Sequence, residues 1–220
     1  YGNSFSGDQS QSGISFNGTR QSLISDGMGI KNNFSGLGNG ITLNGGYSLV
    51  VANNNFTDVK NGVSGINSAG LKVSGNSFTN STTPGDTAIH NDGGTNFTAT
   101  NNDINNFAFG VSEVNSSSSS ISNNIFKNIS TAGIYVPSGS HVLINGNTMS
   151  NFDDVTGIAY GSIGTDLLYR IAGVFTKASQ VTISNNNITG AGVGIQASSS
   201  SYYPSTNTLV TTGGNDLYIT

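Results

Sequence analysis

One four-residue pattern recurs along the whole chain: a residue suited to a bend, then asparagine, then any residue, then a large apolar residue. The copies begin at Gly2, Lys31, Asn53, Gly75, Asn101, Asn123, Gly146 and Asn185. Their asparagines are most often 22 or 23 positions apart, and steps of 26, 29 and 39 residues interrupt this spacing. A period this short is typical of solenoids, in which each repeat is one coil of the chain and the longer steps hold loops.

Each period carries three apolar segments. An alternating stretch such as Val142-Leu143-Ile144 precedes the asparagine, the tetrad ends on Phe, Ile or Met, and a glycine with a β-branched residue follows, as in Gly62-Val63. Such segments indicate three short strands per coil. A unit of about 22 residues cannot bury its apolar side alone, so the coils must stack. We therefore expect an all-β parallel β-helix of about eight coils, right-handed because parallel crossovers strongly prefer that hand.

The repeated asparagine has a structural explanation. Asparagine tolerates the left-handed backbone region at a tight bend, and its amide can bond to the asparagine of the next coil. The sequence thus predicts a structural ladder, with the large apolar residues stacked in the core beside it. The predicted ladder consists of Asn32, Asn54, Asn76, Asn102, Asn124, Asn147 and Asn186.

Composition excludes several classes of protein. Gly, Asn and Ser make up 95 of the 220 residues and only 8% are charged, which excludes a helical bundle. The absence of cysteine excludes disulfides and thiolate metal sites. A net charge of −4 with only seven Lys and Arg leaves no basic face for nucleic acid, and no apolar run is long enough to span a membrane.

The order of alternating strand, tetrad and Gly-Ile/Val resembles the right-handed parallel β-helix repeats of the pectate-lyase-like superfamily, including NosD-type repeats. The resemblance covers nearly the whole chain, which we expect to form a single domain over 1–220. It implies a fold more than a function, because that superfamily includes polysaccharide lyases, glycoside hydrolases, epimerases, phage tailspikes and non-catalytic surface proteins. The chain begins within a coil, which suggests a fragment of a longer protein.

Two stretches depart from the repeat, at 79–86 and at 150–172. Both occupy the same bend of the coil, so in a stacked solenoid they rise from one edge and can wall a single groove. Polar and aromatic residues on these stretches are candidates for ligand binding: Asp86, Tyr160 and Tyr169.

A row of residues should point outward just after the Gly-Ile/Val segment, one from each coil. Three rings stand in this row, namely His90, Tyr135 and Phe175. Exposed rings beside hydroxyls and carboxylates suit the apolar face and polar rim of a sugar. We therefore expect these rings to contact a glycan.

Catalysis is a weaker hypothesis. By resemblance, a pectate-type lyase needs carboxylates for calcium and a basic residue for the proton, and Asp153, Asp154, Asp166 and Arg170 could form such a group. A polygalacturonase pattern would need a paired Asp, a Gly-His-Gly and an Arg-Ile-Lys. Only Asp153-Asp154 is present, since Arg170-Ile171 is followed by Ala172.

The main hypothesis is therefore a non-catalytic β-helix module of an extracellular, cell or phage surface, structural and adhesive, that contacts glycans along one edge. The alternative is a polysaccharide lyase or glycoside hydrolase with its site at 150–172. A tailspike-like trimer or a filament is a third interpretation. We expect no cofactor and no metal site, with calcium left open, a polysaccharide or surface glycan as partner, and no nucleic acid.

Overall fold

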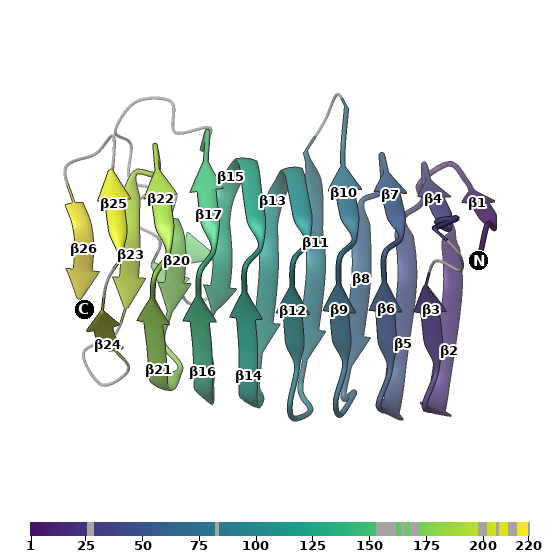
Figure 1. Cartoon of the computed structure of the whole chain (residues 1–220), viewed down its shortest axis with the longest axis horizontal. Coiled ribbons are helices and arrows are strands. Elements are labelled where there is room, and N and C mark those ends of the chain that lie inside the picture. Colours follow the sequence, from purple (N-terminus) through teal and green to yellow (C-terminus); the bar gives the residue numbers. More distant parts are fainter. Residues whose placement is uncertain are drawn as a thin grey trace.

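The protein is a stack of coils built almost wholly from parallel strands. The computed structural model describes residues 1–25, 29–81, 84–152, 162–163, 166–167, 172–197, 202–205, 207–210 and 215–219. Figure 1 shows the strands standing side by side along the long axis, with the N-terminal coil at one end and the C-terminal coil at the other. Among the described residues no helix has the length or apolar character needed to cross a membrane.

Three rows of strands run along the stack, one for each apolar segment of the repeat. The tetrad row consists of β1 (Ser4–Ser6), β4 (Asn33–Ser35), β7 (Asn55–Thr57), β10 (Ser77–Thr79), the start of β13 (Asp103–Val114), the start of β15 (Ile125–Val136), β17 (Thr148–Ser150), β22 (Asn187–Thr189) and β25 (Thr208–Val210). The Gly-Ile/Val row consists of β2 (Ser12–Arg20), β5 (Asn39–Tyr47), β8 (Asn61–Ile66), β11 (Gly85–Asp92), the ends of β13 and β15, β20 (Ala172–Thr176), β23 (Val193–Ala197) and β26 (Asn215–Ile219).

The third row is a separate sheet of eight strands: β3 (Leu23–Ser25), β6 (Val50–Ala52), β9 (Lys72–Ser74), β12 (Thr98–Thr100), β14 (Ser116–Ser122), β16 (Gly139–Asn145), β21 (Ser179–Ser184) and β24 (Tyr202–Ser205). Every pairing in the three rows is parallel and joins equivalent residues of successive coils, as in Phe34 with Phe56 and Val51 with Val73. One short antiparallel pair, β18 (Ser162–Ile163) with β19 (Asp166–Leu167), lies outside the rows. The predicted parallel β-helix is thus confirmed.

The tetrad's apolar residues form the core stack. Ring centroids lie 4.8 Å apart for Phe5 and Phe34, 4.8 Å for Phe34 and Phe56, and 4.6 Å for Phe56 and Phe78. This spacing equals the distance between parallel strands, so each ring rests on the ring of the next coil. The glycine that precedes the β-branched residue in most coils makes room for the stack: a Cβ on Gly62 would lie 2.4 Å from the Phe78 ring.

The tetrad asparagines form a continuous, buried ladder. Each Nδ2 donates to the Oδ1 of the next asparagine, for example Asn54 to Asn76 at 3.1 Å and Asn102 to Asn124 at 2.9 Å. The same Oδ1 atoms accept the backbone N–H of the preceding asparagine, as Asn124 does from Asn102 at 3.0 Å. All seven predicted members take part, and the ladder continues to Asn3 at one end and Asn207 at the other.

Different residues of the tetrad make the bend and form the ladder. The left-handed backbone is found at the first residue, with φ of 55° at Asn53 and 66° at Gly75, rather than at the ladder asparagine that follows. We expected one asparagine to do both. The division has a simple reason, since the ladder needs an inward amide whereas the bend needs only tolerance of positive φ, which Gly and Asn both have.

Candidate functional site

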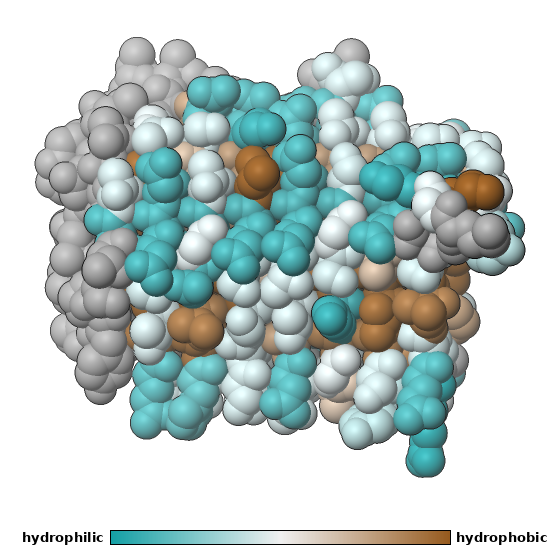
Figure 2. Space-filling model, in the orientation of Figure 1, coloured by the Kyte–Doolittle hydropathy of each residue, from teal (hydrophilic) through white to brown (hydrophobic). Residues whose placement is uncertain are grey.

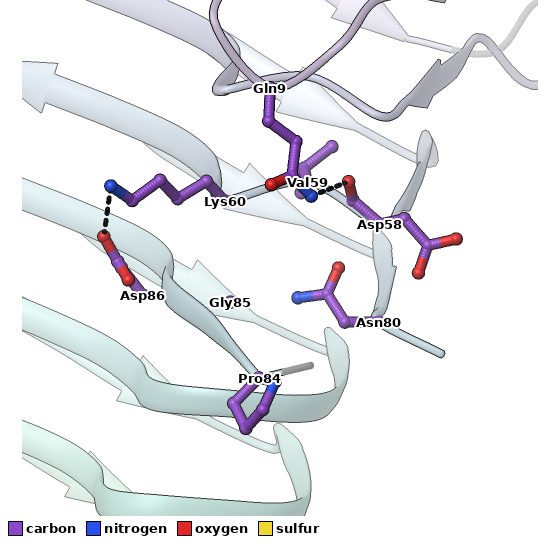
Figure 3. Close-up of a pocket in the computed structure, with 8 residues that line it drawn as sticks. All are labelled: Gln9, Asp58, Val59, Lys60, Asn80, Pro84, Gly85 and Asp86. Carbon is purple, nitrogen blue, oxygen red and sulfur yellow. Dashed lines mark hydrogen bonds and ion pairs between the residues drawn. The ribbon is translucent and has the colours of Figure 1, made fainter. Parts of the chain in front are cut away.

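A polar groove of about 160 Å³ opens on the edge of the stack beside the 79–86 insertion. Figure 3 shows it between the bend that follows β7 and the start of β11. It is lined by Gln9, Asp58, Val59, Lys60, Asn80, Pro84, Gly85 and Asp86. We call this the insertion groove.

The groove exists because one coil leaves the repeat at the bend after its tetrad strand. In other coils the fourth residue after the ladder asparagine is left-handed, with φ of 53° at Asp58, 65° at Asn106 and 52° at Asn128. Asn80 occupies this position in the inserted coil and has no positive φ. The left-handed bend of the other coils is therefore missing at Asn80, and the next strand of this coil, β11, begins at Gly85.

In this coil the Asn80 side chain is buried, and its amide nitrogen has a hydrogen-bond partner whereas its amide oxygen has none within the described part of the chain. Its side chain is 5% exposed, and its Nδ2 donates to the carbonyl of Asn106 at 3.3 Å. Asn106 returns a hydrogen bond to the carbonyl of Asn80 at 3.0 Å. The Oδ1 of Asn80 has no hydrogen-bond partner among the described residues. Gly85 keeps the space open, because a Cβ there would lie 2.3 Å from the Asn80 Nδ2.

The groove carries two carboxylates and one ammonium group, and each of the three has a hydrogen-bond or ion-pair partner. Asp58 accepts hydrogen bonds from the backbone N–H of Ser81 at 2.7 Å and from its hydroxyl at 2.8 Å. Lys60 and Asp86 form an ion pair at 3.4 Å with both side chains more than half exposed. The side chains of the groove therefore carry one net negative charge.

Two further hollows adjoin the insertion groove, and all three lie at the same insertion. Pro84 also lines a hollow of about 360 Å³ with Asn106, Asn128, Ser130, Asn151 and Phe152. Asp86 also lines one of about 300 Å³ with Asn39, Asn61, Ser64, Thr87 and His90. Amides and hydroxyls dominate these linings, which also bring together two predicted ligand-binding residues, Asp86 and His90.

The hollow of about 360 Å³ is relevant to the expectation that both insertions rise from one edge of the stack. Asn151 and Phe152, where the 150–172 insertion begins, line the same hollow as Pro84 of the 79–86 insertion.

The predicted outward row has the expected register but not the expected exposure. His90 pairs with Ser112, Ser112 with Tyr135, and Tyr135 with Phe175 in successive coils. Tyr135 and Phe175 are nevertheless buried, at 8% and 1% exposed. The expectation of exposed rings is therefore wrong for these two, because they stack at 5.2 Å and pack with Phe109 and two alanines in a second apolar cluster.

Of the three predicted rings, His90 has a polar setting. It is half-buried, and its Nδ1 lies 3.3 Å from the hydroxyl of Ser112. Burial lowers the pKa of His90 below its usual value, and the carboxylate of Asp92 offsets part of that effect. His90 is therefore a neutral hydrogen-bonding group near neutral pH, which suits contact with a hydroxyl.

The predicted catalytic group lies almost wholly outside the described residues. This holds for Asp153, Asp154 and Arg170, and for the predicted ligand-binding residues Tyr160 and Tyr169. Of Asp166 only the backbone is described, paired with Ile163 in the β18–β19 hairpin. Within the described part of the chain no group of three His, Asp or Glu side chains could hold a metal ion.

Glu113 has an unusual environment, and the sequence patterns did not lead us to select it. Glu113 is fully buried inside the coil at the end of β13, and neither carboxylate oxygen has a hydrogen bond of good geometry to a described residue. Burial raises the pKa of Glu113 to about 7, although the nearby Ser119 hydroxyl partly favours the ionised form. The signal available was a glutamate at a position where some other coils have apolar residues, such as Leu43 in β5.

Comparisons with known proteins concern the fold. A family model described as a right handed beta helix region matches residues 12–167. No curated protein matches the chain. The chain is similar to the crystal structure of DFA-IIIase from Arthrobacter chlorophenolicus A6 in complex with GF2, at 15% identity and a TM-score of 0.57, over 82% of this chain and 47% of that one. This chain thus spans about half the length of that relative.

A second solved structure, alginate lyase from Paenibacillus sp. str. FPU-7, is 14% identical with a TM-score of 0.39, over 99% of this chain and 88% of that one.

Proposed function

Because the chain belongs to the right-handed β-helix family, we propose that it is a rigid module that binds glycan along the edge beside the 79–86 insertion without cleaving it. The proposal includes a place on an extracellular, cell or phage surface, where such a module is both structural and adhesive. One observation carries it: three adjoining hollows gather at the coil that departs from the repeat, two of them lined mostly by amides and hydroxyls and the insertion groove by amides and charged groups.

This arrangement suits a sugar polymer. Amide and hydroxyl groups can both donate and accept hydrogen bonds, as sugar hydroxyls require. The stacked sheets hold these groups on a fixed frame, so little conformational entropy is lost when a ligand binds. Neighbouring coils present equivalent positions about 4.8 Å apart, which lets successive sugar units meet similar groups.

The carboxylates of the insertion groove are poorly placed for general acid–base catalysis. Asp58 is held by two hydrogen bonds from Ser81, and Asp86 is paired with Lys60. A general acid or base must instead have its carboxylate within hydrogen-bond reach of the reacting group. This supports binding without turnover in the groove.

The alternative is a polysaccharide-modifying enzyme, a lyase or glycoside hydrolase, with Asp153, Asp154, Asp166 and Arg170 as its catalytic group. The observation that favours it is the likeness in fold to the DFA-IIIase solved with GF2. Calcium would be the expected cofactor of a lyase, because carboxylate oxygens are its preferred ligands.

A screen against neutral and uronate polysaccharides separates the two functions. Binding is followed by calorimetry, and cleavage by new reducing ends and by the absorbance of unsaturated ends, with and without calcium. Binding without products supports the module. Products that disappear in Asp154→Ala would establish the enzyme and overturn the proposal, and an absence of binding to every glycan would overturn it as well. Light scattering on the same sample tests for a trimer or filament.

A further inference from the structure

We infer that the insertion groove selects neutral, hydroxyl-rich sugars over uronates, with the Asn80 Oδ1 accepting a hydrogen bond from a sugar hydroxyl. The inference rests on the proposed glycan binding and goes further by naming the class of sugar and the atom that recognises it.

The Asn80 Oδ1 is an acceptor built into the groove without a donor. The side chain is 5% exposed and its oxygen has no partner among the described residues. Figure 3 shows the amide reaching from the ribbon between Asp58 and Gly85, with its oxygen turned toward the side on which Gln9 lies. Buried acceptors are nearly always paired in native proteins, so a donor supplied by a ligand would complete this one.

The chain itself shows that it can satisfy buried amides where the repeat is intact. The ladder asparagines are as deeply buried as Asn80, and their Oδ1 atoms accept hydrogen bonds from the preceding coil, as Asn76 does from Asn54. The unpaired oxygen of Asn80 is thus specific to the coil that carries the insertion. The same coil has Gly85 where any side chain would displace the amide.

The charges of the groove disfavour a carboxylate ligand. Asp58 and Asp86 give two negative charges, and the positive charge of Lys60 is already paired with Asp86. The carboxylate of a uronate would have to break that ion pair or lie beside two carboxylates, and it could not itself bond to the Asn80 Oδ1, because both groups only accept hydrogen bonds. A neutral sugar meets neither obstacle, since its hydroxyl donates to the Asn80 Oδ1 without a charge to compensate.

The decisive experiment compares uronate oligomers with the same oligomers after methyl esterification, which removes the charge and keeps the backbone. Neutral cello-, malto- and xylo-oligosaccharides complete the panel, and affinities are measured by calorimetry with the whole chain. We expect at least one neutral or esterified oligomer to bind about tenfold more tightly than any free uronate.

Three variants assign the effect to the groove. Asn80→Leu keeps the size and removes both the acceptor and the Nδ2 that donates to the Asn106 carbonyl, so it should weaken neutral binding about tenfold, and the thermal melt measures the separate cost of the lost Asn106 contact. Gly85→Ala should weaken it similarly by displacing the amide, and because its Cβ would also lie 2.5 Å from the Phe107 ring, its thermal melt is measured alongside. Asp86→Asn removes one negative charge and releases Lys60, so it should raise the affinity for the free uronate relative to that for its methyl ester.

The outcomes separate this inference from the proposal beneath it. If free uronates bind as tightly as their esters, or if neutral binding persists in Asn80→Leu, the inference is wrong and glycan binding still stands. If no oligosaccharide of either kind binds, the proposed function itself has failed.

Discussion

Two sets of polar side chains lie inside this β-helix, and they differ in how fully their polar atoms are hydrogen-bonded. The asparagine ladder buries its amides completely and bonds each one to the coils on either side. The other set, which we call the inner polar cluster, consists of Asn91, Glu113 and Ser119. It is equally buried, yet the Asn91 Oδ1, both Glu113 oxygens and the Ser119 hydroxyl lack hydrogen bonds of good geometry among the described residues.

The difference follows from repetition. A ladder asparagine always has another asparagine at the same place in the next coil, so every donor meets an acceptor. The inner polar cluster has no such copy: Asn91 pairs in register with Gly65 on one side and with Glu113 on the other. These three groups have no identical residue above or below them to continue a ladder, and several of their polar atoms are left without hydrogen bonds of good geometry within the described part of the chain. Repeated polar residues therefore stabilise the stack, whereas single ones destabilise it.

The largest expected effect comes from breaking the ladder in its middle. Asn102→Leu removes the donor to Asn124 and to the carbonyl of Val73, and the acceptor of the Asn76 amides. Each buried group left unpaired costs about 1–3 kcal/mol, so we expect a loss of roughly 3 kcal/mol or more in the free energy of unfolding. Urea denaturation measures it. A loss below about 1 kcal/mol would mean that the ladder contributes little to stability.

The inner polar cluster predicts a pH effect. The pKa of Glu113 is about 7 in the folded chain and lies near 4.5 when exposed, so the folded state holds the proton more tightly. Its contribution is fully present below pH 4.5 and is lost as the pH rises toward 7. The loss is roughly 3 kcal/mol for a shift of this size.

Glu113→Gln tests this effect because it keeps the shape and cannot ionise. The variant should match the parent at low pH and be the more stable protein above pH 7, as followed by denaturant melts across the range. A parent whose stability rises between pH 4.5 and 7, with no change in Glu113→Gln, would show that Glu113 is not buried as described.

An intermediate effect is expected where a repeated glycine is replaced. Gly62→Ala would place a Cβ 2.4 Å from both the Phe78 ring and the carbonyl of Ala88, which should cost about 1–3 kcal/mol. The chain has an alanine at the equivalent position 88, where the next coil has Ile104 in place of a phenylalanine. Ala88→Gly is therefore the matched control and should change the thermal midpoint much less. Equal costs for both changes would show that the ring does not set the requirement.

The sequence predicted correctly those features that repeat from one coil to the next. The three apolar segments of each period predicted the three rows of strands, and the period predicted the common register of His90, Tyr135 and Phe175. Prediction failed where the answer depends on packing outside the repeat. Nothing in the pattern distinguishes an exposed ring from one covered by a second apolar cluster, as Phe175 is.

The candidate site was predictable only in outline. The longer step between Asn76 and Asn102 located the insertion, and Asp86 and His90 do line one hollow. The special position of Asn80 was not predicted, because asparagine also suits the left-handed bend that other coils have there. Whether its amide turns inward, and whether it finds a partner, depends on the path of the inserted chain.

The smallest expected effect comes from an exposed copy of the ladder contact. The Nδ2 of Asn55 donates to the Oδ1 of Asn33 at 3.0 Å, between the same residue type and across the same 22 positions as the buried contacts, but exposed to solvent. Water can replace either partner there, so Asn33→Ala should lower the free energy of unfolding by less than about 0.5 kcal/mol in the same urea assay used for Asn102→Leu. A cost comparable to that of Asn102→Leu would mean that amide pairing itself stabilises the stack. The expected small cost means instead that amide pairing matters because burial leaves the polar groups no alternative partner, and the unpaired oxygens of Asn80 and Glu113 are then costly for the same reason.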